Sequence, residues 1–378
     1  MTTTTTTLAG LYSSSSHDHS LKLIILLLVV VLIFVSDAQP ENLVKKHRNV
    51  SAVLVFGDST SDPGNNNYIL TPFKGNFPPY GKDFANQVPT GRFTNGLLAS
   101  DYVARHLGLK DNVPPYLDPS LSIHDLRTGV SFASAGSGYD PLTPTISNVI
   151  PLPRQLEYFK EYKARLIAEI GKTKTKQSIN NSLYLVSAGT NDFVVNYFTL
   201  PIRRQEYSLP GYMSFVLKTQ LNFLQALWDE GARKIVVAGL PPMGCLPIVI
   251  TLFSKNAILD RGCIDFYSSV ARTYNSMLQN ELNLMQFNHA HEGGQIAYFD
   301  TYSPLLDAIV GHKYDFKEVK RGCCGTGLLE VTFLCNPHSK ICSDASKYAF
   351  WDSIHPTQEM YKICFKALQP TIDHMIKG

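Results

Sequence analysis

Apolar residues form short unbroken runs along the chain after residue 50, and longer stretches with helical spacing separate these runs. Each run is short and does not alternate with polar residues, which is typical of strands buried on both faces of a parallel sheet. The spacing predicts helices over residues 213–229 and 266–287. Alternating strands and helices favour an α/β layered fold. The predicted strands are residues 53–56, 183–186, 235–238 and 296–299.

The N-terminus has a different pattern. Residues 1–20 are rich in Thr and Ser, and an apolar run follows over residues 23–35. This run is shorter than the roughly 20 residues of a membrane-spanning helix, and the small residues Ser36 and Ala38 suit a signal peptidase. We expect a signal peptide with a low-complexity extension over 1–38 and a short leader over 39–50.

The remainder, residues 51–378, contains no polar linker long enough to separate two domains, and we expect a single domain. Cleavage of the signal peptide would leave no stable membrane anchor, and a short uncleaved anchor is the alternative. The chain is therefore expected to be secreted and extracellular.

Cysteines and acceptor triplets agree with secretion. The chain has seven cysteines, most of which would pair in an oxidising compartment, and the odd number leaves one over. N-glycosylation triplets occur at Asn49-Val50-Ser51 and Asn180-Asn181-Ser182.

Metal and nucleic-acid sites are both disfavoured. A zinc cluster would draw on Cys323, Cys324, Cys335 and Cys342, whose spacing lacks the C-x2-C knuckles of structural zinc sites. The net charge of +3 comes from 34 Lys and Arg against 31 Asp and Glu. These charges are spread thinly, without the basic block that a phosphate backbone would require. We expect neither a metal nor a nucleic-acid partner.

Candidate chemistry follows the predicted strands, because ligands bind beyond the carboxyl ends of the strands in such sheets. Ser59 follows the first strand and Asn191 follows the second. A run of small residues around Gly136 and Gly138 would let the backbone approach a ligand closely. A serine at a strand end is, taken alone, more often a helix N-cap.

Asp352 and His355 lie three residues apart, directly before Pro356. On a tight turn or a first helical turn, this spacing brings both side chains to one side. A serine hydrolase needs a nucleophile, a histidine base and a group that orients the histidine. A surface or helix-terminus role is the alternative for His355 alone.

Seven motifs, taken in order, resemble those of the GDSL esterase/lipase family of SGNH hydrolases, in its secreted plant branch. The resemblance extends from Phe56 to about Pro370, and it departs from the family name at Thr60, where leucine is expected at a non-catalytic position. The motifs are FGDS-x-x-D-x-GNNN (56–67), GRF-x-NG (91–96), SFASAGSGYD (131–140), GTND (189–192), LPPMGCLP (240–247), CCGTG (323–327) and FWDSIHPT (350–357).

This resemblance implies a catalytic triad in which Ser59 is the nucleophile, His355 is the general base and acid, and Asp352 orients His355. It also implies an oxyanion hole formed by the backbone N–H groups of Ser59 and Gly136 and the side-chain amide of Asn191. Neutral donors of this kind stabilise a tetrahedral intermediate without titrating.

The implied fold is a flavodoxin-like three-layer α/β/α sandwich with a five-stranded parallel sheet. The implied substrate is a small-molecule or lipid ester, and no cofactor is needed. A Cys245–Cys263 disulfide is also implied, whereas the pairing of the four later cysteines stays open. Cys364 lies in an apolar helical pattern and is expected to be the unpaired buried thiol.

Further residues around the candidate site have expected roles. Gly138 is a second candidate for the role given to Gly136. Asp58 and Asp192 are expected to cap helices that start after the strand ends. Asp62 and residues 65–67 are expected to fix the turn beside Ser59, and residues 72–88 form either a mobile lid or a rigid loop.

An acyltransferase and a non-catalytic binding protein are the alternative functions, and the oligomeric state stays open.

Overall fold

The computed structural model describes residues 50–377. The predicted signal peptide, nearly all of the leader and the Asn49 acceptor site lie outside these residues. In the described part of the chain, no helix is long and apolar enough to span a membrane.

The central sheet consists of four parallel strands, and each predicted strand is confirmed and is one residue longer than predicted. Val53 pairs with Leu183 in the first pair of strands, and Val237 pairs with Tyr298 in the last. In spatial order the strands are β1 (Val53–Gly57), β2 (Leu183–Ser187), β3 (Lys234–Ala238) and β4 (Gln295–Phe299).

The expected fifth strand is reduced to a short edge segment, so the sheet has four strands within residues 50–377. Beside β1, residues 130–134 make three hydrogen bonds to it but form only an isolated parallel bridge at Ser131. The Asn65 side chain donates to the carbonyl oxygens of Ser131 and Ala133, both at 2.8 Å. Ser131 also exchanges backbone hydrogen bonds with Pro114 and Tyr116, so the segment has partners on both edges and still forms only isolated bridges.

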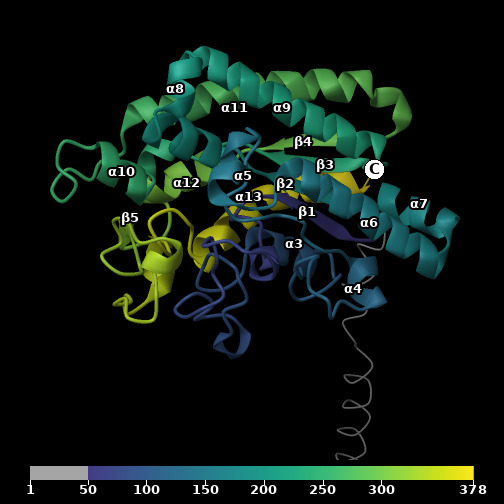
Figure 1. The fold of residues 1–378 in the computed structure, drawn as a ribbon, viewed down its shortest axis with the longest axis horizontal. Helices are drawn as coiled ribbons and strands as arrows, with labels where there is room; N and C mark the ends of the chain where they lie inside the picture. The colour runs from purple at the N-terminus through teal and green to yellow at the C-terminus, as the bar shows by residue number, and fades with distance from the viewer. Residues whose placement is uncertain (1–49, 378) are drawn as a thin grey trace, which may run out of the picture. The chain divides into compact units, whose positions relative to one another are not determined.

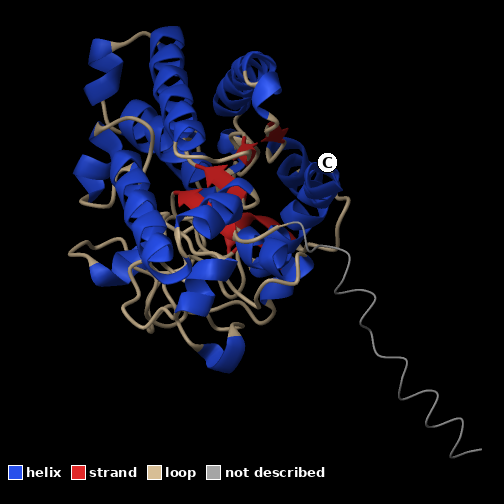
Figure 2. Cartoon of the chain, turned by 90° about the vertical axis from the view of Figure 1, so that its right-hand side faces the viewer, coloured by secondary structure: helices blue, strands red, loops and turns tan. Residues whose placement is uncertain are grey.

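Helices cover both faces of the sheet, which confirms the layered α/β prediction (Figures 1 and 2). On one face lie α6 (Leu152–Ile170), α9 (Leu209–Asp229) and α11 (Asp265–Asn288), the last two at the predicted positions. On the other face lie α3 (Ala99–His106), α12 (Tyr302–Ile309) and α13 (Gln358–Lys377). The shorter helices are α4 (Ile123–Thr128), α5 (Leu142–Ser147), α7 (Lys172–Asn180), α8 (Ile202–Glu206), α10 (Pro247–Phe253) and the π-helix η4 (Asp192–Thr199).

Aromatic side chains fill the space between the sheet and α6 and α9. The Phe56 ring of β1 is fully buried and lies 5.8 Å from the ring centroids of Phe159 in α6 and Phe223 in α9. Burial of each such side chain contributes about 1.5–3 kcal/mol. This packing fixes the position of β1, and hence of the turn that follows it.

A second, smaller sheet pairs β5 (Glu318–Gly322) with β6 (Tyr348–Phe350) in parallel. The connection between these strands contains two disulfides, Cys323–Cys342 and Cys324–Cys335. The structure thereby settles the pairing that the sequence left open. A third disulfide joins Cys245 to Cys263, and Cys364 of α13 is a free buried thiol, as the sequence analysis expected.

Candidate active site

Three side chains from distant parts of the chain meet beyond the carboxyl end of β1. Ser59 comes from the turn after β1, and Asp352 and His355 come from the turn between β6 and α13. The His355 Nε2 atom lies 2.8 Å from the Ser59 Oγ, and its Nδ1 atom lies 2.7 Å from the Asp352 Oδ2. Ser59 is 8% exposed, His355 3% and Asp352 0%. The structure therefore brings these three predicted residues into one hydrogen-bonded chain.

A sharp turn that begins at Gly57 presents Ser59. Gly57 has a φ of 138°, and a Cβ at this position would lie 1.8 Å from the Ser187 carbonyl oxygen. The Asp58 carboxylate then accepts from the Thr60 N–H at 2.9 Å and from its hydroxyl at 2.8 Å. Burial raises the pKa of Asp58, and these hydrogen bonds oppose the rise. The expectation that Asp58 caps a helix is wrong, because residues 59–61 form a turn.

Asp352 and His355 belong to a second tight turn, which precedes α13. The Asp352 Oδ1 atom accepts from the backbone N–H of Ile354 at 2.9 Å and of His355 at 2.7 Å. The Phe93 ring lies 5.0 Å from the imidazole, between centroids. One carboxylate oxygen thus shapes the turn, while the other faces the His355 Nδ1.

Hydrogen-bond donors for an anion are present near this chain. Within residues 50–377, the backbone N–H groups of Ser59 and Gly136 donate to no protein acceptor. The Asn191 amide donates to the Ser137 carbonyl oxygen at 2.9 Å, which fixes the amide and leaves its second N–H for a ligand. Ser59 and Asn191 line the same cavity.

Gly136 and Gly138 have different surroundings. Gly136 has a φ of 87°, which favours glycine. A Cβ at Gly138 would lie 2.2 Å from the Asp192 carboxylate, so glycine is required there for packing.

The turn after Ser59 is bonded to the loop that carries Gly136. The Asp62 carboxylate accepts from the Ala135 N–H at 2.9 Å and from the Asn65 N–H at 2.6 Å. The Asn66 amide donates to the Ala135 carbonyl oxygen at 2.9 Å. Burial raises the pKa of Asp62 to about 6. The expected role of these residues in fixing the turn is confirmed, and they also hold two parts of the site together.

Asp192 does not cap its own helix, contrary to expectation. Its carboxylate accepts from the backbone N–H of Tyr139 at 2.9 Å and of Asp140 at 3.0 Å, and from the Thr143 hydroxyl. Burial raises its pKa to about 7. Asp192 therefore holds residues 139–143 against η4, a contact between distant segments that strand-end patterns do not reveal.

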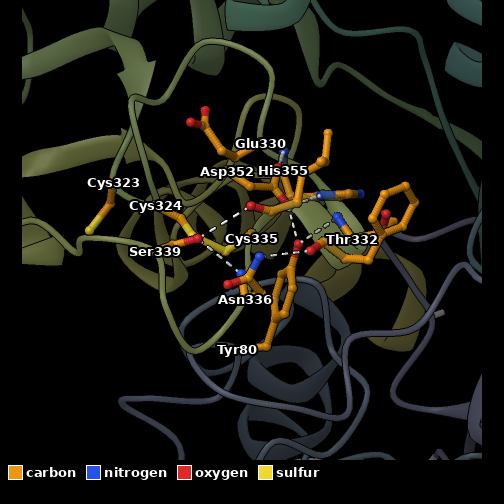
Figure 3. The surroundings of a disulfide bond; sticks show 12 residues. Tyr80, Cys323, Cys324, Glu330, Thr332, Cys335, Asn336, Ser339, Asp352 and His355 are labelled. Atoms are coloured by element: carbon orange, nitrogen blue, oxygen red, sulfur yellow. Dashed lines mark hydrogen bonds and ion pairs between the residues drawn. A yellow bond between two sulfur atoms is a disulfide. The ribbon is translucent and has the colours of Figure 1, made fainter.

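Tyr80 is a member of the site that the sequence analysis missed. Its hydroxyl donates to the Asp352 Oδ2 and accepts from the Thr332 N–H, both at 2.9 Å (Figure 3). Thr332 lies in the loop closed by the Cys324–Cys335 disulfide. Burial raises the pKa of Tyr80 well above its usual value, with a smaller contribution from Asp352. Tyr80 belongs to residues 72–88, which the sequence distinguished only as a loop, and its burial anchors that loop beside the site.

We expect Tyr80→Phe to lower kcat about 10–100-fold with little change in KM, because a hydrogen bond to a charged group is lost. The effect should fall on kcat rather than KM, because Tyr80 acts on the position of Asp352 and not on substrate binding. Steady-state kinetics, with thermal unfolding to show that the variant is folded, separate the two parameters.

Tyr162→Phe is the matched control. It removes a buried hydroxyl that donates to the Leu126 carbonyl oxygen at 2.7 Å, in a different part of the molecule. Equal changes of kcat in the two variants would show that Tyr80 has no specific role in positioning Asp352.

Sequence comparison assigns the chain to a family. Residues 53–368 match the model of the GDSL-like lipase/acylhydrolase family. The chain belongs to the GDSL family. One GDSL esterase/lipase from Arabidopsis thaliana is 57% identical over 333 residues, covering 88% of this chain and 89% of the relative. A second from the same plant is 46% identical over 326 residues, covering 86% and 90%.

Among solved structures, this GDSL protein is similar to a catalytic mutant of an acetylxylan esterase from Geobacillus stearothermophilus. The TM-score is 0.37 and the sequences are 14% identical, and the match covers 85% of this chain and 94% of that chain. The family assignment rests on the sequence relatives.

Asn180, the acceptor residue within the described chain, lies at the end of α7 and is half-buried. Its glycosylation stays a prediction.

Proposed function

We propose that this GDSL ester hydrolase cleaves carboxylic esters with Ser59 as nucleophile, His355 as general base and acid, and Asp352 as the group that orients His355. The observation that carries the proposal is the continuous hydrogen-bonded chain from the Ser59 Oγ through both imidazole nitrogens to the Asp352 Oδ2. Such a chain raises the nucleophilicity of a serine hydroxyl that would otherwise be a weak nucleophile.

The reaction has two halves. The Ser59 Oγ attacks the ester carbonyl carbon and its proton moves to the His355 Nε2; the bond to the alcohol oxygen then breaks, and the alcohol leaves with that proton. Water next attacks the acyl-enzyme and gives a proton to the Nε2. The bond to the Ser59 Oγ breaks, the Oγ recovers the proton, and the acid is released.

The carbonyl oxygen becomes negative in each half-reaction. We assign its stabilisation to the backbone N–H groups of Ser59 and Gly136, which are unpaired within residues 50–377, and to the free N–H of the Asn191 amide. These donors are held in place before the substrate binds, so they need no reorganisation when the charge develops.

We expect Asn191→Ala to lower kcat about 10²–10³-fold, the usual effect of removing one oxyanion donor. KM should change less, because the donor acts mainly on the charged intermediate. Asn148→Ala is a control, since the Asn148 amide donates to the Leu70 carbonyl oxygen on the surface. Full activity of Asn191→Ala would exclude Asn191 from the oxyanion hole.

We also propose that cleavage of the signal peptide after about residue 38 yields a secreted protein with a short leader, residues 39–50, and one domain, residues 51–378. Three disulfides in residues 50–377 suit an oxidising compartment. N-terminal sequencing of protein from the medium of expressing cells tests this proposal, which requires a mature chain that begins near residue 39.

The direct test of the proposed chemistry combines a fluorophosphonate with p-nitrophenyl esters. Mass spectrometry should find one phosphonylated peptide, containing Ser59, and the ester assay should lose its activity in proportion to labelling. An inert Ser59 together with no ester hydrolysis would overturn the proposed function and favour a non-catalytic protein.

A further inference from the structure

A cavity of about 130 Å³ extends from Ser59 into the interior of the fold. Its walls come from β2, β3 and β4 on one side and from α3, α12 and α13 on the other, so it lies between two layers of the structure. Polar residues line the end near Ser59 and Asn191, and the opposite end is lined mainly by aliphatic side chains such as Val103, Leu305 and Leu368.

Alternate residues of β2 and β3 form the cavity wall on the side of the sheet. Leu185 and Ser187 of β2 lie two residues apart and face the same way, as do Val236 and Ala238 of β3. Leu185 and Ala238 each retain 9% exposure, whereas Tyr184, which faces the opposite layer, is fully buried. Because the strands are covered on both faces, the exposed surface of Leu185 and Ala238 belongs to the cavity wall.

On the side of the helices, the cavity wall includes residues from one face of α13. Tyr361, Cys364 and Leu368 are spaced three and four residues apart and lie on one face of the helix, which forms the wall opposite the sheet. Small side chains such as Cys364 and Ala99 leave the space that larger residues would fill.

The inner part of the cavity carries no charge. Burial raises the pKa of the Cys364 thiol to about 12 and that of the Tyr361 hydroxyl well above its usual value, so both stay neutral at physiological pH. The Asp58 carboxylate belongs to the end next to Ser59. A neutral, largely aliphatic wall favours an apolar ligand, because a charged or strongly polar group would lose its hydration without compensation.

We infer that this cavity binds the aliphatic acyl chain of the ester, with the carbonyl carbon at Ser59 and the alkyl tail between the sheet and α13. The inference rests on the proposed function and adds the substrate class. An apolar cavity of about 150 Å³ can take up benzene, so the space here suits an acyl chain of about six carbons.

The first test is the chain-length profile of the wild-type protein. Each methylene that enters an apolar site raises affinity about fourfold, so the four additional methylenes of p-nitrophenyl hexanoate should raise kcat/KM about 250-fold over the acetate. It should fall again for the dodecanoate, whose chain exceeds the cavity. A profile that is highest for the acetate, or flat, would contradict the inference.

Substitutions at Cys364 test the location of the chain. Cys364→Leu fills the inner end and should lower the hexanoate-to-acetate ratio of kcat/KM about tenfold, the loss of one or two buried methylenes. Cys364→Ala enlarges the cavity and should raise the octanoate-to-hexanoate ratio. Ala367→Leu, on the exposed face of the same helix, is the matched control and should leave both ratios unchanged.

Fluorophosphonates with ethyl and hexyl chains separate the failure of this inference from the failure of the proposed function, because they label Ser59 without turnover. Labelling by both, with the same hexyl-to-ethyl rate ratio in wild type, Cys364→Leu and Cys364→Ala, would overturn the cavity assignment and keep the nucleophile. No labelling and no hydrolysis would overturn the proposed function and this inference with it.

Discussion

Ser59→Ala is expected to lower kcat for p-nitrophenyl esters by about 10⁶, the effect found when a triad nucleophile is removed from a serine protease. The loss is large because the acyl-enzyme cannot form, and the His355 Nε2, now without the hydroxyl 2.8 Å away, has only water to activate. Residual hydrolysis would come from substrate binding and the oxyanion donors. The measurement is kcat from initial rates, with thermal unfolding to show that the variant is folded.

His355→Ala should cause a similar loss, and the double variant should be little worse than either single variant, because the two residues act as a unit. Independent, multiplicative losses would contradict this coupling. A folded Ser59→Ala variant that retained more than a few per cent of wild-type kcat would refute the assignment of the nucleophile.

Asp352→Asn is expected to lower kcat by about 10⁴, as the corresponding change does in a serine protease, where the histidine is held in the wrong tautomer. In the wild-type protein every group that faces the carboxylate is a donor: the His355 Nδ1, the backbone N–H of His355 and Ile354, and the Tyr80 hydroxyl. An amide NH2 group cannot accept from any of them. The NH2 group would turn toward the Nδ1 of the imidazole. The imidazole proton would then have to move to the Nε2, the nitrogen beside Ser59.

The matched control for this change is Asp373→Asn. Asp373 also contacts a histidine, the Nε2 of His106 at 2.7 Å, in a pair that is partly exposed. This control should leave kcat unchanged. An Asp352→Asn variant with kcat within tenfold of wild type would show that Asp352 does not orient His355.

The sequence by itself determined much of the local structure. The four strands of the central sheet were predicted because runs of apolar residues reflect burial on both faces, which is a local signal. Ser59, Asp352 and His355 were predicted from motifs that resemble those of the GDSL family. The turns that carry them are local, one beginning at Gly57 and the other held by the Asp352 carboxylate.

Only the tertiary structure decided the contacts between distant segments. The Tyr80–Asp352 hydrogen bond joins residues 272 positions apart, and nothing near Tyr80 in the sequence indicates its partner. The pairing of Cys323 with Cys342 depends on how the chain folds between β5 and β6, which four closely spaced cysteines do not specify.

The number of strands in the sheet and the cavity beside Ser59 also depend on contacts between distant segments. The segment beside β1 forms only isolated bridges, and its outer edge bonds to the Asn65 amide and to the backbone of Pro114 and Tyr116, contacts that arise only when these segments come together. The space beside Ser59 is lined by small residues from two layers, such as Ala238 of the sheet and Cys364 of α13. Residue patterns specify which face of each element is buried, whereas packing between the elements determines what those faces meet.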